Sequence, residues 1–140
     1  MNFKLVKNFH KNAPADLLFW LICITALLSR SIYILEIDAS PLFTFPVVDG
    51  KTYVLHATSL ARGNWLGLGQ GPFWQPPLYP YVLGIIKTLA PESFFYAIRW
   101  FQVILGALTC GLIYTLGKYW FTKKIALIAG FSACFYAPLI

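Results

Sequence analysis

A single carboxylate, Asp49, stands where an apolar segment gives way to a short amphipathic one, in the stretch FPVVDGKTY. The chain has only five acidic residues, so an acid at this position needs a reason. It has two interpretations. Asp is a favoured helix N-cap because its side-chain oxygen accepts hydrogen bonds from the first free N–H groups, and a helical pattern starts at Gly50. Alternatively, a carboxylate at a membrane surface could act as a general base.

Basic and aromatic side chains follow Asp49 and could bind an anionic substrate. An arginine can donate two hydrogen bonds to one phosphate, so Arg99 could bind a lipid phosphate or simply anchor its helix at the headgroups. The proline-rich run FWQPPLYPY, which contains Tyr79, suits interfacial anchoring or substrate contact. The residues predicted to contact a substrate are Lys51, Tyr53, Arg62, Tyr79 and Arg99.

The three cysteines do not indicate a metal site. Cys23, Cys110 and Cys134 all lie in apolar runs without a metal-ligand neighbour at a useful spacing. We interpret them as small buried hydrophobic residues. No cofactor and no metal site are therefore predicted from the residues.

The composition points to a membrane protein. The chain is 59% hydrophobic and 11% charged, with a mean hydropathy of +0.66, whereas a soluble domain is about a quarter charged. The net charge of +6 indicates topology, because Lys and Arg collect on the cytoplasmic side of a membrane. The basic residues are scattered singly, without a continuous patch, so nucleic-acid binding is excluded.

Apolar runs divide the chain into predicted membrane spans and connections. A spanning helix needs about 20 mostly apolar residues. A signal peptide is the rival interpretation of the first run, but the run is long and a small-x-small cleavage signal is missing. The predicted segments are a cytoplasmic tail (1–16), a first span (17–35), an outer loop (36–94), a second span (95–117), a cytoplasmic loop (118–124) and a truncated third span (125–140).

Details of the spans predict how they pack. Arg30 lies near the outer end of the first span, where its side chain could reach the headgroups. Ala107 and Gly111 form a small-xxx-small pair that allows close approach of a neighbouring helix. The aromatic run from Phe94 to Tyr96 resembles an interfacial belt. The third run ends without a polar flank, so we expect the chain to be cut within a larger membrane protein.

The outer loop has its own helical pattern. From Gly50 to Arg62 the apolar residues recur at helical spacing, which predicts a short amphipathic helix on the membrane surface. The run from Leu78 to Ala90 is too short to span. If it did span, the lysines at 118–124 would lie outside, against the positive-inside tendency. It is therefore predicted to lie at the interface or to be re-entrant.

The order of these segments resembles the start of a GT-C glycosyltransferase. The segments that carry the resemblance are PVVDGKTYVLHATSLARGNWLG, PFWQPPLYPYVLG and IRWFQVILGALTCGLIYTLGKYWF. They are similar to the bacterial membrane glycosyltransferases related to the protein O-mannosyltransferases (family 39) and to the aminoarabinose transferase of lipid A. The resemblance implies an all-α polytopic membrane protein with a GT-C-like fold, of which this chain is the N-terminal part.

The resemblance also implies a substrate and a catalytic residue. The donor of such enzymes is a sugar on a polyprenyl phosphate, and their first outer loop carries an essential Asp, which Asp49 matches. Many relatives have a second acid directly after it, where this chain has Gly50. The missing acid weakens any inference of a bound divalent metal.

One carboxylate is chemically sufficient for this transfer. A glycosidase uses two acids because it must protonate a poor leaving group, whereas polyprenyl phosphate leaves as a stabilised anion. Asp49 would deprotonate the acceptor hydroxyl as a general base. Cations near the phosphate would stabilise its developing charge.

A non-catalytic membrane module, such as a transporter fragment or an assembly subunit, is the alternative function. Transporters place polar or broken helices at the bilayer midplane, but the spans here hold few polar groups. The reactive side chains lie in the outer loop, which favours the enzyme. We predict a multi-pass protein of the plasma or inner membrane with a cytoplasmic N-terminus, inactive as this chain alone. The sequence does not identify the acceptor.

Overall fold

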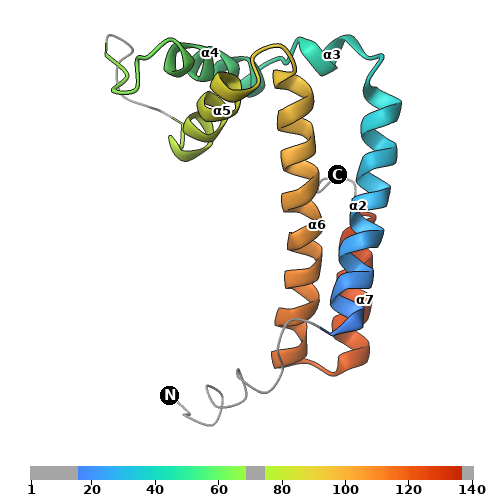
Figure 1. The fold of residues 1–140 in the computed structure, drawn as a ribbon. Helices are drawn as coiled ribbons and strands as arrows, with labels where there is room; N and C mark the ends of the chain where they lie inside the picture. The colour runs from blue at the N-terminus through green and yellow to red at the C-terminus, as the bar shows by residue number, and fades with distance from the viewer. Residues whose placement is uncertain (1–15, 69–74, 137–140) are drawn as a thin grey trace, which may run out of the picture. The chain divides into compact units, whose positions relative to one another are not determined.

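The computed structural model describes residues 16–68 and 75–136, and in these residues the chain is helical without any strand. Its helices are α2 (Leu17–Ile37), α3 (Pro41–Thr44), α4 (Asp49–Ala61), α5 (Leu78–Leu89), α6 (Phe94–Trp120) and α7 (Lys123–Cys134) (Figure 1). The predicted all-α fold class is confirmed. The tail predicted at 1–16 lies, apart from Asp16, outside the described residues.

Two of the described helices are long and apolar enough to cross a bilayer. Helix α2 has 21 residues and α6 has 27, and each contains a long, strongly apolar stretch. At a rise of about 1.5 Å per residue, each reaches the roughly 30 Å of a hydrocarbon core. Helix α5 has only 12 residues, which is too short to span. By length and apolar composition, α2 and α6 could therefore each cross a membrane.

The chain divides into two compact units, each with its own packing. Unit 1 contains residues 1–33 and 102–140, and unit 2 contains residues 34–101. Helices α2 and α6 both cross the boundary, so each contributes one part of its length to each unit. The predicted site residues Asp49, Lys51, Tyr53, Arg62, Tyr79 and Arg99 all belong to unit 2.

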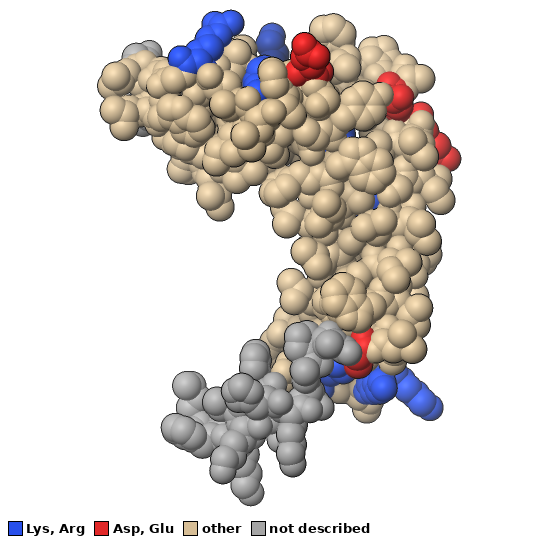
Figure 2. Space-filling view, viewed as in Figure 1, with Lys and Arg blue, Asp and Glu red and all other residues tan. Residues whose placement is uncertain are grey.

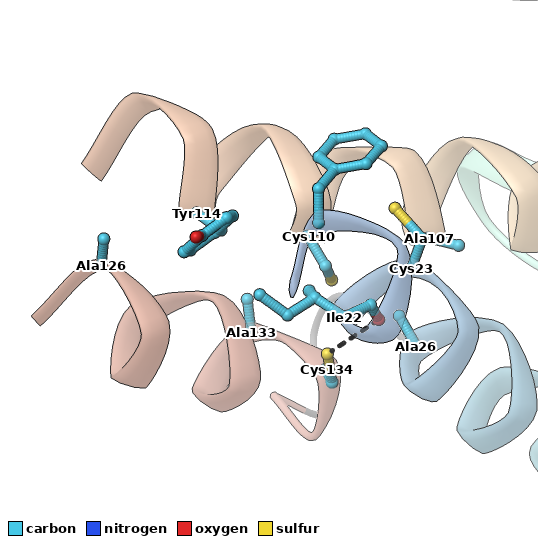
Figure 3. Close-up of a cluster of buried hydrophobic side chains, with 10 residues drawn as sticks. Ile22, Cys23, Ala26, Ala107, Cys110, Tyr114, Ala126, Ala133 and Cys134 are labelled. Atoms are coloured by element: carbon cyan, nitrogen blue, oxygen red, sulfur yellow. Dashed lines mark hydrogen bonds between the residues drawn. The ribbon is translucent and has the colours of Figure 1, made fainter. Parts of the chain in front are cut away.

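Unit 1 is held together by small residues where α2, α6 and α7 meet (Figure 3). Ala107 is only 3% exposed. A side chain added at Gly111 would begin 2.6 Å from both the Sγ of Cys23 and the ring of Phe19. Only a glycine permits α2 and α6 to approach this closely, so the predicted role of the Ala107–Gly111 pair is confirmed.

The cysteines belong to the same core, as predicted. Cys23, Cys110 and Cys134 are all buried free thiols. The Cys134 thiol donates to the carbonyl oxygens of Gly130, at 3.3 Å, and Ile22, at 3.6 Å, and the second of these contacts links α7 to α2 (Figure 3). The thiols therefore act as small packing groups with weak donors.

Arg30 corrects one of the predictions. The prediction that its side chain reaches the headgroups is wrong, because the residue is only 2% exposed. Its guanidinium donates to the carbonyl oxygens of Ala26, at 3.2 Å, and Cys134, at 3.4 Å. The reason is the neighbouring Gly106, whose missing side chain leaves space for the guanidinium. A Cβ there would lie 2.7 Å from the Arg30 Nε.

A polar cluster closes the end of unit 1 at which α2 begins and α6 ends. One oxygen of Asp16 accepts the N–H of Phe19 at 2.9 Å, and the other accepts the Tyr114 hydroxyl and the Lys118 ammonium, both at 2.8 Å. Burial by itself would raise the pKa of Asp16, but these hydrogen bonds outweigh it and hold the pKa below its ordinary value. Figure 2 shows charged side chains gathered near this end, whereas the visible sides of the bundle are largely uncharged.

Unit 2 is built on the pairing of α4 with α5 (Figure 1). Gly84 on α5 lies against Leu60 on α4, so closely that a Cβ there would be 2.8 Å from the Leu60 Cβ. The buried core contains Ala57, Leu83, Phe94 and Ile98. Phe94 is 3% exposed, so the interpretation of Phe94 as an interfacial belt residue is wrong. It packs on α4 and α5, contacts that the local pattern does not reveal.

Candidate active site

A tight turn leads into α4 and determines where Asp49 lies. Val48 has φ 50° and ψ −124°, close to the first central position of a type II′ turn, which glycine normally occupies. The Gly50 N–H donates to the Val47 carbonyl at 3.1 Å and closes the turn. A β-branched residue in this region is strained, at a typical cost of about 1–3 kcal/mol. Strain of this kind is characteristic of residues that hold a functional group.

The N-cap interpretation of Asp49 is wrong. Helix α4 begins at Asp49 itself, and the capping position is Val48, which makes no side-chain cap hydrogen bond. Backbone carbonyls of the turn take the early donors, since Gly50 N–H bonds to Val47 and Thr52 N–H bonds to Val48. Within the described part of the chain, the exposed Asp49 carboxylate accepts no hydrogen bond. Its oxygens are therefore available to a substrate.

Gly50 occupies the position at which many relatives have a second acid, and the surrounding structure is crowded there. A Cβ at this position would lie 2.9 Å from the Cβ of Pro46, and the proline ring cannot rotate away. A side chain here would require Pro46, which directly precedes the turn, to shift. In its present conformation the backbone around Asp49 therefore leaves no room for a side chain at position 50.

An open apolar groove lies beside this turn. Its volume is about 380 Å³, within the range typical of small-molecule sites. Asp49 lies between two of the lining residues in sequence, Val47 and Lys51, and Lys51 is exposed. The remaining lining residues are Thr44, Phe45, Pro46, Val54, Leu55 and Phe95. The groove therefore suits an apolar chain. Its lining includes one cation, Lys51, and the carboxylate of Asp49 lies two residues before Lys51 in the sequence.

Arg99 supports the wall of this groove. Its guanidinium donates to the carbonyl oxygens of Leu42 and Phe43, both at 3.4 Å, and stacks 5.2 Å above the Phe43 ring. These carbonyls belong to the short helix α3, which leads directly into Thr44 and Phe45 of the groove. Arg99 lies one turn beyond Phe95 on α6, so it is near the groove without lining it.

Tyr53 and Tyr79 lie together, but they pack against each other. Their rings meet edge to face with centroids 5.0 Å apart, and both belong to the packing around the unit 2 core. Arg62 directly follows α4 and is exposed. Since α4 has 13 residues, Arg62 lies about 20 Å along the helix from Asp49. The predicted residues therefore form two groups, one at each end of α4, with the tyrosines between them.

Lys87 is a candidate that the sequence analysis missed. It is the one charged residue in α5, a signal that was present in the sequence. Its ammonium donates to the Thr58 hydroxyl at 2.7 Å and lies 4.6 Å from the centre of the Phe94 ring. Burial, and then the nearby charge of Arg62, lower the pKa of Lys87. Lys87 joins Arg62 at the far end of α4.

The described residues contain no group of three His, Cys, Asp or Glu side chains that could hold a metal ion. The start of α4 brings together an exposed carboxylate at Asp49, the cations Lys51 and Arg99, and an apolar groove. Such a set can accept a proton and bind an amphiphilic anion.

Comparison with known protein families gives a match for part of this chain. Residues 74–139 match the family model of the dolichyl-phosphate-mannose-protein mannosyltransferases, just under half of the chain. No match was found among curated proteins or among solved structures. The matched segment contains Tyr79, Lys87 and Arg99 but begins after Asp49. The match confirms the predicted resemblance to membrane glycosyltransferases of this kind over residues 74–139.

Proposed function

We propose that this chain carries the catalytic base and part of the donor site of an enzyme that transfers a sugar from a polyprenyl phosphate to an acceptor at the outer face of the membrane. The observation that supports this most directly is the Asp49 carboxylate, exposed at the first position of α4 and held by a strained turn beside an apolar groove. Asp49 would take the proton of the acceptor hydroxyl as it attacks the anomeric carbon.

In this proposal, the apolar groove and Lys51 bind the donor. The first isoprene units would lie against Phe45, Val54 and Phe95, which are among the apolar lining residues. Lys51 would bind the phosphate and stabilise the charge that develops as the sugar leaves. Arg99 would hold the wall of the groove through α3, with its remaining N–H donors directed to the same phosphate. Tyr53, Tyr79 and Arg62 remain proposed substrate contacts.

The donor assay tests this function. The complete protein, purified in detergent with a polyprenyl-phosphate sugar, is expected to release polyprenyl phosphate as the sugar passes to an acceptor hydroxyl, or to water when no acceptor is supplied. Lys51→Met is expected to raise the donor concentration at half-maximal rate by about tenfold, because it loses one charge-assisted contact. Lys124→Met, an exposed lysine of α7, is the matched control and keeps the wild-type value. A protein that binds the donor but releases no polyprenyl phosphate would favour the non-catalytic module instead.

Orientation in the membrane is a separate part of the proposal. The salt bridge between Asp16 and Lys118 joins the start of α2 to the end of α6. This contact supports a topology in which both helix ends lie on the same side of the membrane. Lys123 and Lys124 are exposed near the same end, and the positive-inside tendency supports a cytoplasmic location for that end. Reporter fusions are expected to locate Asn64 outside and Thr122 inside. The reverse result at both positions would contradict an outer-face site.

A further inference from the structure

The far end of α4 carries two cations that the proposed sugar transfer does not use together. Lys87 contacts Thr58 on α4, and Arg62 lies one turn after Thr58 at the end of the same helix; burial first, and then the charge of Arg62, lower the pKa of Lys87. In the part of the chain that the structure describes, the one salt bridge joins Asp16 to Lys118. Neither Lys87 nor Arg62 is therefore neutralised by a described carboxylate.

Lys87 is held in one position by contacts on two sides. The Thr58 hydroxyl donates its own hydrogen to the Val54 carbonyl at 2.7 Å, so its oxygen can only accept from the Lys87 ammonium, also at 2.7 Å. The ring of Phe94, 4.6 Å away, contacts the charge from another side. An ammonium has three donors, so part of its hydrogen-bonding capacity is left for a ligand.

Arg62 lies on the same face of α4 as Thr58, the residue that Lys87 contacts. Thr58 and Arg62 are four residues apart, and the Arg62 N–H still donates to the Thr58 carbonyl at 3.2 Å, so both lie on one face of the helix. Lys87 binds Thr58 and therefore lies under that face. Figure 2 shows basic side chains standing on the surface over α4. One cation is held by contacts and half-buried, and the other is exposed and ends in a forked donor group.

We propose that Lys87 and Arg62 form a binding site for a phosphate group, at the end of α4 opposite Asp49. The fixed ammonium supplies a point charge, and the guanidinium supplies two parallel donors that match phosphate oxygens. Thr58 positions Lys87 and does not contact the ligand. The phosphate belongs either to a lipid headgroup or to a free phosphorylated molecule, since both present the same oxygens. The site does not depend on sugar transfer at Asp49.

Calorimetric titration of the complete protein in detergent tests this site with two probes, inorganic phosphate and a short-chain phosphatidic acid, and with phosphatidylcholine for comparison. Lys87→Met and Arg62→Gln are each expected to weaken phosphate-group binding by at least about tenfold. Thr58→Val is expected to weaken it less, because it frees the ammonium without removing it. Lys124→Met should bind as the wild type does.

The two probes separate the possible sources of the phosphate. Loss of both affinities in the Lys87 and Arg62 variants indicates a site open to free phosphate, whereas loss for phosphatidic acid alone indicates a lipid headgroup. Thermal midpoints verify folding, and the exposed Arg62 keeps the test valid if Lys87→Met unfolds. Equal affinities in wild type, Lys87→Met and Arg62→Gln for both probes would overturn the site, as would an equal loss in Lys124→Met.

Discussion

Asp49→Asn is expected to reduce sugar transfer by about a hundredfold or more, the usual loss when a general base is removed. The substitution keeps the size and polarity of the side chain but removes its ability to accept the acceptor's proton. The Asp49 carboxylate caps no helix, so the variant should fold normally. The loss of a negative charge in the first turn of α4 costs at most about 1 kcal/mol. The measurement is release of polyprenyl phosphate by purified variants.

Glu92→Gln is the matched control for this prediction. Glu92 is an exposed acid of unit 2 in the connection between α5 and α6, and its neutralisation should leave both rate and stability unchanged. A normal rate in Asp49→Asn would remove Asp49 from the mechanism. A low rate that accompanies a lowered unfolding temperature would instead mean that Asp49 stabilises the turn.

Gly111→Leu is expected to lower the stability of the protein more than any surface substitution on α6. The first atom of the new side chain already lies 2.6 Å from Cys23 and Phe19, so α2 and α6 must separate to admit it. Overpacking of this kind typically costs about 1–3 kcal/mol and occasionally more. A lower thermal midpoint of the purified protein in detergent would measure the effect, and Gly111→Ala should produce a smaller decrease.

Thr109→Leu controls for adding an apolar side chain to the same helix. Thr109 is exposed on α6, and substitutions at such positions usually change stability by less than about 0.5 kcal/mol. Equal thermal midpoints for the Gly111 and Thr109 variants would show that α2 and α6 do not pack at this glycine in the purified protein.

The local sequence determined the two long apolar helices and the helix that follows Asp49. Apolar runs of about 20 residues become α2 and α6 because length and hydropathy are properties of consecutive residues. The helical spacing after Asp49 predicted the helix that is found as α4, and the Ala107–Gly111 pair predicted close helix packing. These features repeat at fixed intervals along the chain, so they can be read without knowledge of the partner.

Tertiary structure alone decided the environments of the charged and aromatic residues. Lys87 meets Thr58, 29 residues earlier, and Arg30 meets the carbonyl of Cys134, 104 residues later. Phe94 is buried against α4 and α5, although its local pattern suggested an interfacial position. At the start of α4, the carbonyls of Val47 and Val48 accept the first N–H groups in place of the Asp49 side chain. The sequence did not predict this, because a turn at a strained valine has no sequence signature. Each of these environments depends on which distant part of the chain packs against the residue. The spacing of neighbouring residues along the chain does not specify that packing partner.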